Sequence, residues 1–144
     1  MNIPPGRKNC VTPVAHKKIR FSGKQTSTLY LLNPSKRSVD KVQVDGCAIT
    51  EGLRCDWAVE VNDDVSREEI FIELKGSHIT DAVKQLEATI DRLSSDPGHT
   101  KKRCLIASAR SRLTSTEIKR LQIRFLNEYN AKFKRLKSGS SDPL

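Results

Sequence analysis

The sequence predicts an α/β domain in which a mixed central β-sheet is flanked by helices. Residues 41–75 contain three short runs rich in β-branched and aromatic residues, and polar turns separate them, as in an antiparallel meander. Residues 77–137 then change to helical spacing, to a buried-looking strand, and to helical spacing again. Because that strand follows a helical crossover, we expect it to run parallel to its neighbour in the sheet.

"QTSTLYLLN" is short and apolar, and it fits either a strand or a helical turn. The meander strands are expected in "DKVQVDGCAI", which alternates in polarity, in "LRCDWAVEV" and in "IFIELKG". We expect Trp57 to pack in the core on the face opposite Asp56. The polar loop "NDDVSREE" precedes the third strand. Its acids are expected to form a solvated turn, namely Asp63, Asp64, Glu68 and Glu69.

One helix is expected before the strand "KRCLIASA" and one after it. The first lies in "SHITDAVKQLEATIDRLSSD", and Ser77 or Thr80 is expected to cap it. Its apolar residues recur at spacings of three and four, at Ile79, Val83, Leu86, Ile90 and Leu93. The second begins at Ser115 and is expected to continue for about twenty residues through "STEIKRLQIRFLNEYNAKFKRLK". Its expected apolar stripe is Ile118, Leu121, Phe125, Tyr129 and Phe133.

One domain is expected over residues 25–137. Residues 1–24 are rich in Pro, Lys and Arg and are expected to form a basic, partly disordered arm, and residues 138–144 a disordered tail. No apolar run approaches the roughly 20 residues that span a bilayer, and "MNIPPGRKNC" lacks the apolar region of a signal peptide. We therefore expect a cytoplasmic protein with no membrane partner.

The four cysteines, Cys10, Cys47, Cys55 and Cys104, are widely spaced and form no C-x-x-C pair. This spacing argues against a zinc site and favours reduced thiols. Cys47 and Cys55 are near enough in the chain to face each other across a hairpin, although nothing in the sequence requires a bond.

The net charge of +9 is distributed unevenly along the chain. Residues 1–44 carry +8, residues 45–97 carry −8, and residues 98–144 carry +9. An acidic middle between basic ends suits a protein that holds cations centrally and a polyanion around them. We therefore expect a nucleic-acid partner; the alternative is that the basic segments only keep the chain soluble.

The run "EIFIELKG" ends on a carboxylate and an ammonium. Alternation places Glu73 and Lys75 on the same face of the strand. Asp56 lies early in the strand expected to pair antiparallel with this one, so two carboxylates and a lysine are expected to converge. The simpler alternative is an ion pair at a solvated sheet edge.

Such a group suits metal-dependent hydrolysis of a phosphodiester. The carboxylate oxygens of Asp56 and Glu73 are hard ligands for Mg²⁺, for which Mn²⁺ is an acceptable substitute, and the backbone carbonyl of Leu74 is a further candidate ligand. The metal polarises the phosphate and lowers the pKa of a bound water. Lys75 would orient that water or stabilise the charge that develops on phosphate.

Asp56 followed by Glu73-Leu74-Lys75 resembles the motif of the PD-(D/E)xK nuclease superfamily. In the order of elements the resemblance covers residues 41–125. It implies a restriction-endonuclease-like core and a Mg²⁺-dependent endonuclease. It also implies that Gln85, on the helix that follows the motif, supports the catalytic group.

The sequence departs from that motif in two places. Cys55 stands where the motif has proline before the aspartate. Many members also carry a glutamate on a helix before the sheet, whereas residues 1–44 contain no Glu. Asp45 or Glu51 is the expected substitute as an additional metal ligand.

DNA is favoured over RNA as the partner. Its backbone is expected to contact basic residues that follow the fourth strand, namely Arg110, Arg112, Lys119, Arg120 and Arg124. Aromatic residues make up only 5% of the chain, which argues against a single-strand binder built on base stacking. A chain with one active site would require a homodimer to cut both strands of a duplex.

Two other classes of function remain open. One is a non-catalytic nucleic-acid-binding module that retains the nuclease fold, and it predicts no effect of Mg²⁺ on stability. The other is an assembly subunit whose last helix packs on a partner, and it predicts weak nucleic-acid binding without a steep salt dependence. Restriction, repair, junction-resolving and defence nucleases share the core, and the sequence does not choose among them.

Overall fold

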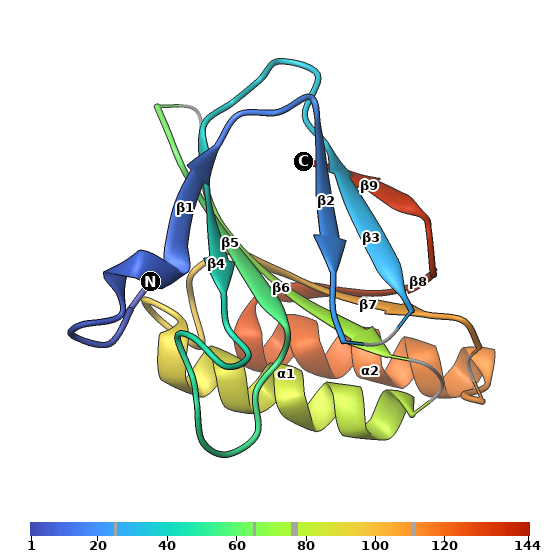
Figure 1. The fold of residues 1–144 in the computed structure, drawn as a ribbon. Helices are drawn as coiled ribbons and strands as arrows, with labels where there is room; N and C mark the ends of the chain where they lie inside the picture. Colours follow the sequence, from blue (N-terminus) through green and yellow to red (C-terminus); the bar gives the residue numbers. More distant parts are fainter. Residues whose placement is uncertain (25, 65, 76–77, 111) are drawn as a thin grey trace.

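A computed structural model describes residues 1–24, 26–64, 66–75, 78–110 and 112–144, and it shows an α/β protein in three layers (Figure 1). The middle layer is a mixed six-stranded sheet of order β1-β4-β5-β6-β7-β8. Helices α1 (Ile79–Leu93) and α2 (Ser115–Tyr129) cover one face of this sheet. A three-stranded sheet of order β2-β3-β9 covers the other face.

The central sheet contains the meander that the sequence predicts. Its strands are β1 (Val11–Val14), β4 (Val39–Gln43), β5 (Trp57–Asn62), β6 (Arg67–Lys75), β7 (Lys102–Ser108) and β8 (Ala131–Lys137). Strands β4, β5 and β6 are antiparallel neighbours, whereas β6, β7 and β8 run parallel. The expected parallel crossover strand is therefore confirmed.

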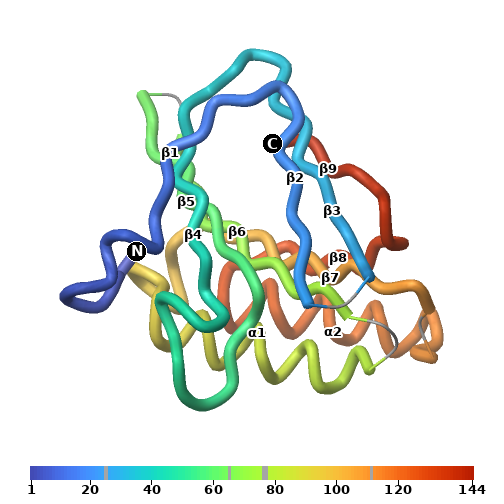
Figure 2. Tube along the Cα trace, in the orientation of Figure 1, coloured from blue at the N-terminus to red at the C-terminus, as the bar shows by residue number. Residues whose placement is uncertain are grey.

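The second sheet was not expected from the sequence. The chain leaves the central sheet after β1, forms the hairpin of β2 (Lys18–Ser22) and β3 (Thr28–Leu32), and returns at β4 (Figure 2). Strand β9 (Ser141–Pro143) pairs parallel to β3. The expectation of an irregular arm and a disordered tail is wrong where β1, β2 and β9 lie. Strands β1 and β9 are too short to show a periodic pattern, and pairing with distant segments stabilises them. Strand β2 alternates in burial and pairs locally with β3.

Strand β6 is buried on both of its faces because it lies between these two layers. Phe71 packs in the core beneath α1 and α2. Ile70, Ile72 and Leu74 pack instead against apolar residues of β2 and β3. Glu73 shares the helix-side face with Phe71, so it projects toward α1.

The first helix agrees with its expected apolar positions. Ile79, Val83, Leu86, Ile90 and Leu93 are all buried. The residue that caps it is His78, whose side chain makes no capping hydrogen bond among the described residues. Thr80 lies inside the helix, and Ser77 lies outside the residues that the structure describes.

The second helix is shorter than expected. A capping box between Thr114 and Glu117 opens it. It ends at Tyr129, because Asn130 adopts a left-handed conformation with φ of 52°. Phe133 therefore lies on β8, where it packs into the helix-side core.

The expectation of four reduced cysteines is also wrong. Cys10 and Cys47 form a disulfide that joins the start of β1 to the loop after β4. Cys55 and Cys104 are free and fully buried.

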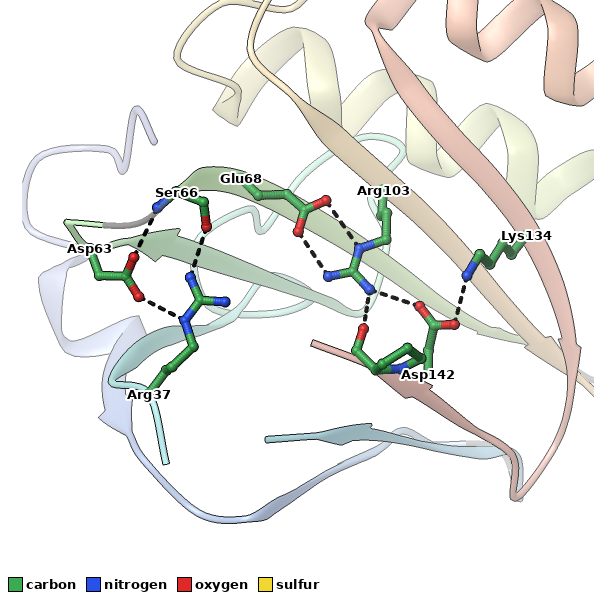
Figure 3. Close-up of polar contacts among 8 residues, drawn as sticks. Arg37, Asp63, Ser66, Glu68, Arg103, Lys134 and Asp142 are labelled. Atoms are coloured by element: carbon green, nitrogen blue, oxygen red, sulfur yellow. Dashed lines mark hydrogen bonds and ion pairs between the residues drawn. The ribbon is translucent and has the colours of Figure 1, made fainter. Parts of the chain in front are cut away.

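Ion pairs connect the layers (Figure 3). Arg103 on β7 is buried and contacts Glu68 on β6 at 2.8 Å and Asp142 on β9 at 2.9 Å. Lys134 on β8 lies 2.9 Å from the same Asp142. Glu68 and the fully buried Glu69 therefore do not belong to a solvated turn.

Neither α1 nor α2, the α-helices of the described segments, is long and apolar enough to cross a bilayer.

Candidate active site

Asp56 and Glu73 lie side by side where β5 begins and β6 ends. Trp57, the first residue of β5, pairs with Ile72, so the preceding Asp56 reaches the level of Glu73. The backbone N–H of Asp56 donates to the carbonyl of Ile72 at 3.2 Å. The backbone N–H of Leu74 donates to Asp56 Oδ2 at 2.8 Å. The antiparallel pairing thus fixes one carboxylate on the backbone of the other strand.

Glu73 is the most deeply buried acid of the site. Its side chain is only 2% exposed, and its Oε1 has no hydrogen-bond partner among the described residues. Burial, with the negative charge of Asp56, raises the pKa of Glu73 to about 9. Lys75 opposes this effect, because its Nζ lies 3.4 Å from Glu73 Oε2.

Asp56 is also affected by burial, but its side chain is less deeply buried than that of Glu73. Burial raises the pKa of Asp56, and the hydrogen bond from the Leu74 N–H lowers it. The Leu74 backbone thus contacts the site through its N–H, and its carbonyl stays a predicted ligand.

Gln85 on α1 reaches the same place from the helix layer. Its Nε2 donates to the carbonyl of Arg54 at 3.1 Å, while its Oε1 is buried without a partner in the described segments. Thr89, one turn later, accepts a hydrogen bond from the N–H of Cys55 and donates one to the carbonyl of Gln85, both at 2.8 Å. These bonds attach α1 to the segment that leads into Asp56.

A hollow of about 280 Å³ opens beside Asp56 and Gln85. Asp45 lines it and forms an ion pair with Arg54 at 2.7 Å. Glu51, the other expected ligand, is exposed and is not among the residues that line it. The structure therefore brings Asp45 to the site and leaves Glu51 outside.

The five expected DNA-binding residues fall into two groups. Arg110 and Arg112 are exposed in the loop after β7. Because Lys75 pairs with Ser108, β6 and β7 end at the same level, and these arginines follow the end of the strand next to Lys75. The other three, Lys119, Arg120 and Arg124, lie on α2. Arg120 and Arg124 line a groove of about 600 Å³ between the two helices, and Arg124 is paired with Glu87 at 2.7 Å. Only the first group lies near the strand ends that carry the carboxylates.

Residues between β2 and β3 also contribute to the site, which the sequence did not predict. Ser27 is buried, and its Oγ donates to the backbone carbonyl of Lys75 at 2.8 Å. Lys24 lines the same hollow as Asp56. "FSGK" carries a turn signal after an alternating pair of apolar residues, which could have indicated a hairpin but not the surface on which it packs.

The donor set fits a divalent cation, although it is small. The residues that the structure describes contain no group of three His, Cys, Asp or Glu side chains placed to hold a metal. Two buried oxygens nevertheless lack partners among the described residues. Glu73 Oε1 belongs to the residue opposite Asp56, and Gln85 Oε1 to a side chain that lines the same hollow as Asp56. Oxygen donors of this kind are those that Mg²⁺ prefers, and a cation would relieve the burial cost that raises both carboxyl pKa values.

The chain matches no protein-family model, no curated protein and no solved structure. The function is therefore inferred from the chemistry of this site.

Proposed function

We propose that the protein is a metal-dependent endonuclease of the PD-(D/E)xK type, with a restriction-endonuclease-like core, that hydrolyses phosphodiester bonds in DNA. The observation that carries the proposal is the buried carboxylate of Glu73. It has an oxygen without a partner in the described structure, it lies beside Asp56, and Lys75 is 3.4 Å away. A buried carboxylate pair with a single lysine is costly for stability alone, which favours a functional role.

Asp56 and Glu73 would hold Mg²⁺ or Mn²⁺, and Gln85 Oε1 would support them. When bound, the cation supplies Lewis-acid polarisation of the phosphate and lowers the pKa of a water. The backbone N–H of Leu74 would keep Asp56 oriented through its hydrogen bond to Oδ2. Asp45 is the further acid within reach of the hollow, and its release from Arg54 would be needed for it to bind.

Lys75 is the residue that acts on the reacting group. Its side chain is 20% exposed, so its ammonium lies between the buried Glu73 carboxylate and solvent. In that position Nζ can donate a hydrogen bond to the attacking water or to a phosphate oxygen. Glu73 positions Lys75 through the contact of Oε2 with Nζ at 3.4 Å.

The nucleic acid would approach at the edge where the parallel strands end. Arg110 and Arg112 lie there and would contact phosphates, whereas the basic residues of α2 are farther along the helix layer. Cleavage of both strands by a homodimer and a cytoplasmic location remain predictions. The cytoplasmic location is the weaker of these two predictions, because disulfides such as Cys10–Cys47 persist mainly in oxidising compartments.

The proposal is tested by incubating plasmid, linear duplex, single-stranded DNA, a four-way junction and RNA with Mg²⁺, Mn²⁺ or EDTA. We expect metal-dependent cleavage of DNA, and we expect Lys75→Ala to lower kcat by at least about 100-fold while DNA affinity stays nearly unchanged. Lys137→Ala is the matched control, because Lys137 ends β8 at the same sheet edge. Cleavage at the wild-type rate by Lys75→Ala would remove Lys75 from the mechanism.

A second candidate function is a nucleic-acid-binding module without catalysis. The observation that favours it is the lack of a three-residue metal cluster in the described chain. The two functions differ in Mg²⁺ linkage: the nuclease should gain thermal stability with Mg²⁺, and Glu73→Gln should abolish the gain. Glu69→Gln is the control, because Glu69 is also buried on β6 but is bonded to Ser94 and Ser95. A wild-type protein that binds DNA without any response to Mg²⁺ would favour the binding module.

A further inference from the structure

The loop between β2 and β3 packs directly on the candidate active site. A Cβ atom placed on Gly23 would lie 3.6 Å from Cγ of Asp56 and 3.5 Å from Cδ1 of Leu74. The backbone at Gly23 therefore lies next to the Asp56 carboxylate, at a separation where an added Cβ would make an ordinary van der Waals contact.

Both ends of this loop are attached to the strands that carry the site. At its start, the indole Nε1 of Trp57 donates to the carbonyl of Ser22 at 2.7 Å. At its end, the hydroxyl of Ser27 donates to the carbonyl of Lys75 at 2.8 Å. Residues on both sides of Lys24 are thus bound to Trp57, which follows Asp56, and to Lys75, two residues after Glu73.

Lys24 is the cation that this loop adds to the hollow. Asp45, Arg54, Asp56 and Gln85 line the same hollow. Arg54 is already paired with Asp45, and Lys75 with Glu73. Within the described residues no acid pairs with Lys24, so its charge is available for an anion from outside the chain.

We propose that Lys24 is a substrate-binding residue, whose ammonium contacts a phosphate of the nucleic-acid strand beside the phosphate that is cleaved. The inference rests on the proposed function for the identity of the substrate. It deepens that function because it adds Lys24 of the β2–β3 loop to the residues that bind the substrate, in a hollow that Gly52, Leu53 and Arg54 also line. A hollow of about 280 Å³ has room for a phosphate and its sugar.

A binding contact and a catalytic contact have different kinetic signatures. Loss of Lys24 should raise KM and leave kcat nearly unchanged, whereas loss of Lys75 should lower kcat. Each phosphate contact also contributes to the salt dependence of binding, with a slope of about 0.7 to 0.9 in log K against log salt.

The test compares Lys24→Gln, Lys24→Arg and the matched control Lys17→Gln. Lys17 is an exposed lysine that precedes the other end of β2, away from the loop. Affinity for a short fluorescein-labelled DNA duplex and for the corresponding single strand is measured over a range of salt concentrations, with Ca²⁺ in place of Mg²⁺. Cleavage of both in Mg²⁺ gives kcat and KM, and thermal melting checks that each variant folds.

We expect Lys24→Gln to weaken binding by about 5- to 10-fold and to lower the salt slope by about one contact, with Lys24→Arg close to the wild type and Lys17→Gln unchanged. Equal behaviour of Lys24→Gln and Lys17→Gln, in a wild type that cleaves DNA, would overturn the role of Lys24 and leave the nuclease intact. A binding defect confined to Lys24→Gln, in a wild type that never cleaves, would overturn the nuclease and support the contact. A wild type that neither binds nor cleaves would overturn both.

Discussion

At the scale of single residues, Glu73 differs from an ordinary glutamate in a way that stability measurements can detect. In the folded protein its pKa is raised to about 9, mainly by burial. In the unfolded chain a glutamate titrates near its ordinary value of about 4.3. Between these two values folding must take up a proton, so the contribution of Glu73 to stability becomes less favourable as the pH rises.

Glu73→Gln should therefore stabilise the protein in EDTA. At pH 7 to 8 we expect a gain of about 1–3 kcal/mol in the free energy of unfolding, since Gln has no proton to take up, and the gain should vanish near pH 4. Urea unfolding from acidic to alkaline pH measures this difference. Glu69→Gln should be less stable than the wild type, because the Glu69 carboxylate is bonded to Ser94 and Ser95. A Glu73→Gln variant that is destabilised at pH 8 would mean that the ion pair with Lys75 outweighs burial.

At this scale the sequence predicts which side chains lie near one another, but not their surroundings. Asp56, Glu73, Lys75 and Gln85 were placed from alternation, antiparallel pairing and the family resemblance, and the structure brings them to one region. The burial of Glu73 depends on a layer of the molecule that was not predicted. Trp57 is only half-buried, and its indole bonds to the carbonyl of Ser22 in that same layer.

At the scale of elements, the change from α2 to β8 shows why a periodic pattern can be misleading. Phe125, Tyr129 and Phe133 repeat every four residues, which is typical of one helix face. In the structure the helix ends between Tyr129 and Phe133, and both still reach the same core because β8 packs beneath α2. The only local signal for the break is Asn130, a residue that tolerates the left-handed conformation.

Asn130→Val should destabilise the fold by about 1–2 kcal/mol, because a β-branched residue is strained at positive φ. Asn130→Gly removes that strain, but it also removes the hydrogen bond from Asn130 Nδ2 to the carbonyl of His99. We therefore expect Asn130→Gly to fall between the wild type and Asn130→Val. Chemical denaturation of the three proteins gives the order, and a Val variant as stable as the wild type would contradict the assigned helix end.

The Cys10–Cys47 disulfide acts on the loop that carries Asp45 and Arg54. It closes a sequence separation of 37 residues. Replacing both cysteines by serine should lower the free energy of unfolding by about 2–4 kcal/mol, chiefly because the unfolded chain is no longer constrained. Denaturation with and without a thiol reductant measures this loss. The reductant should affect the wild type and leave the double variant unchanged, because Cys55 and Cys104 form no disulfide.

At the scale of the whole molecule, a buried charge network holds the small sheet on the central sheet. Arg103 lies between Glu68 and Asp142, and its guanidinium also donates to the carbonyl of Pro143 (Figure 3). Arg37 and Asp63 form a second pair in the same view, but their side chains are 27% and 29% exposed. The two pairs share their chemistry and differ in burial.

Asp142→Asn should therefore cost more than Arg37→Gln. We expect a loss of about 2–4 kcal/mol for Asp142→Asn, because Arg103 and Lys134 lose a buried counter-charge, and about 0–1 kcal/mol for Arg37→Gln. Urea unfolding of both variants under one set of conditions measures the contrast. Equal losses would mean that burial does not determine the strength of these pairs.

The general architecture followed from local patterns, and the three-layer arrangement did not. The meander and the parallel crossover strand arise from neighbouring segments. The pairing of β3 with β9 joins Tyr30 to Ser141, and no local pattern in "SDP" announces it. Interactions between segments this distant in sequence are set by the rest of the fold.

That pairing also has a consequence for the time course of folding. Contacts between distant segments form slowly, so the central sheet should assemble before the small sheet docks on it. The single tryptophan, Trp57, lies at the boundary and bonds to the small sheet, so its fluorescence should report the docking step. Refolding followed by fluorescence would then lag behind refolding followed by far-ultraviolet circular dichroism. During that lag the carboxylates would already be aligned across β5 and β6, and Lys24 would not yet have reached its place in the hollow beside them.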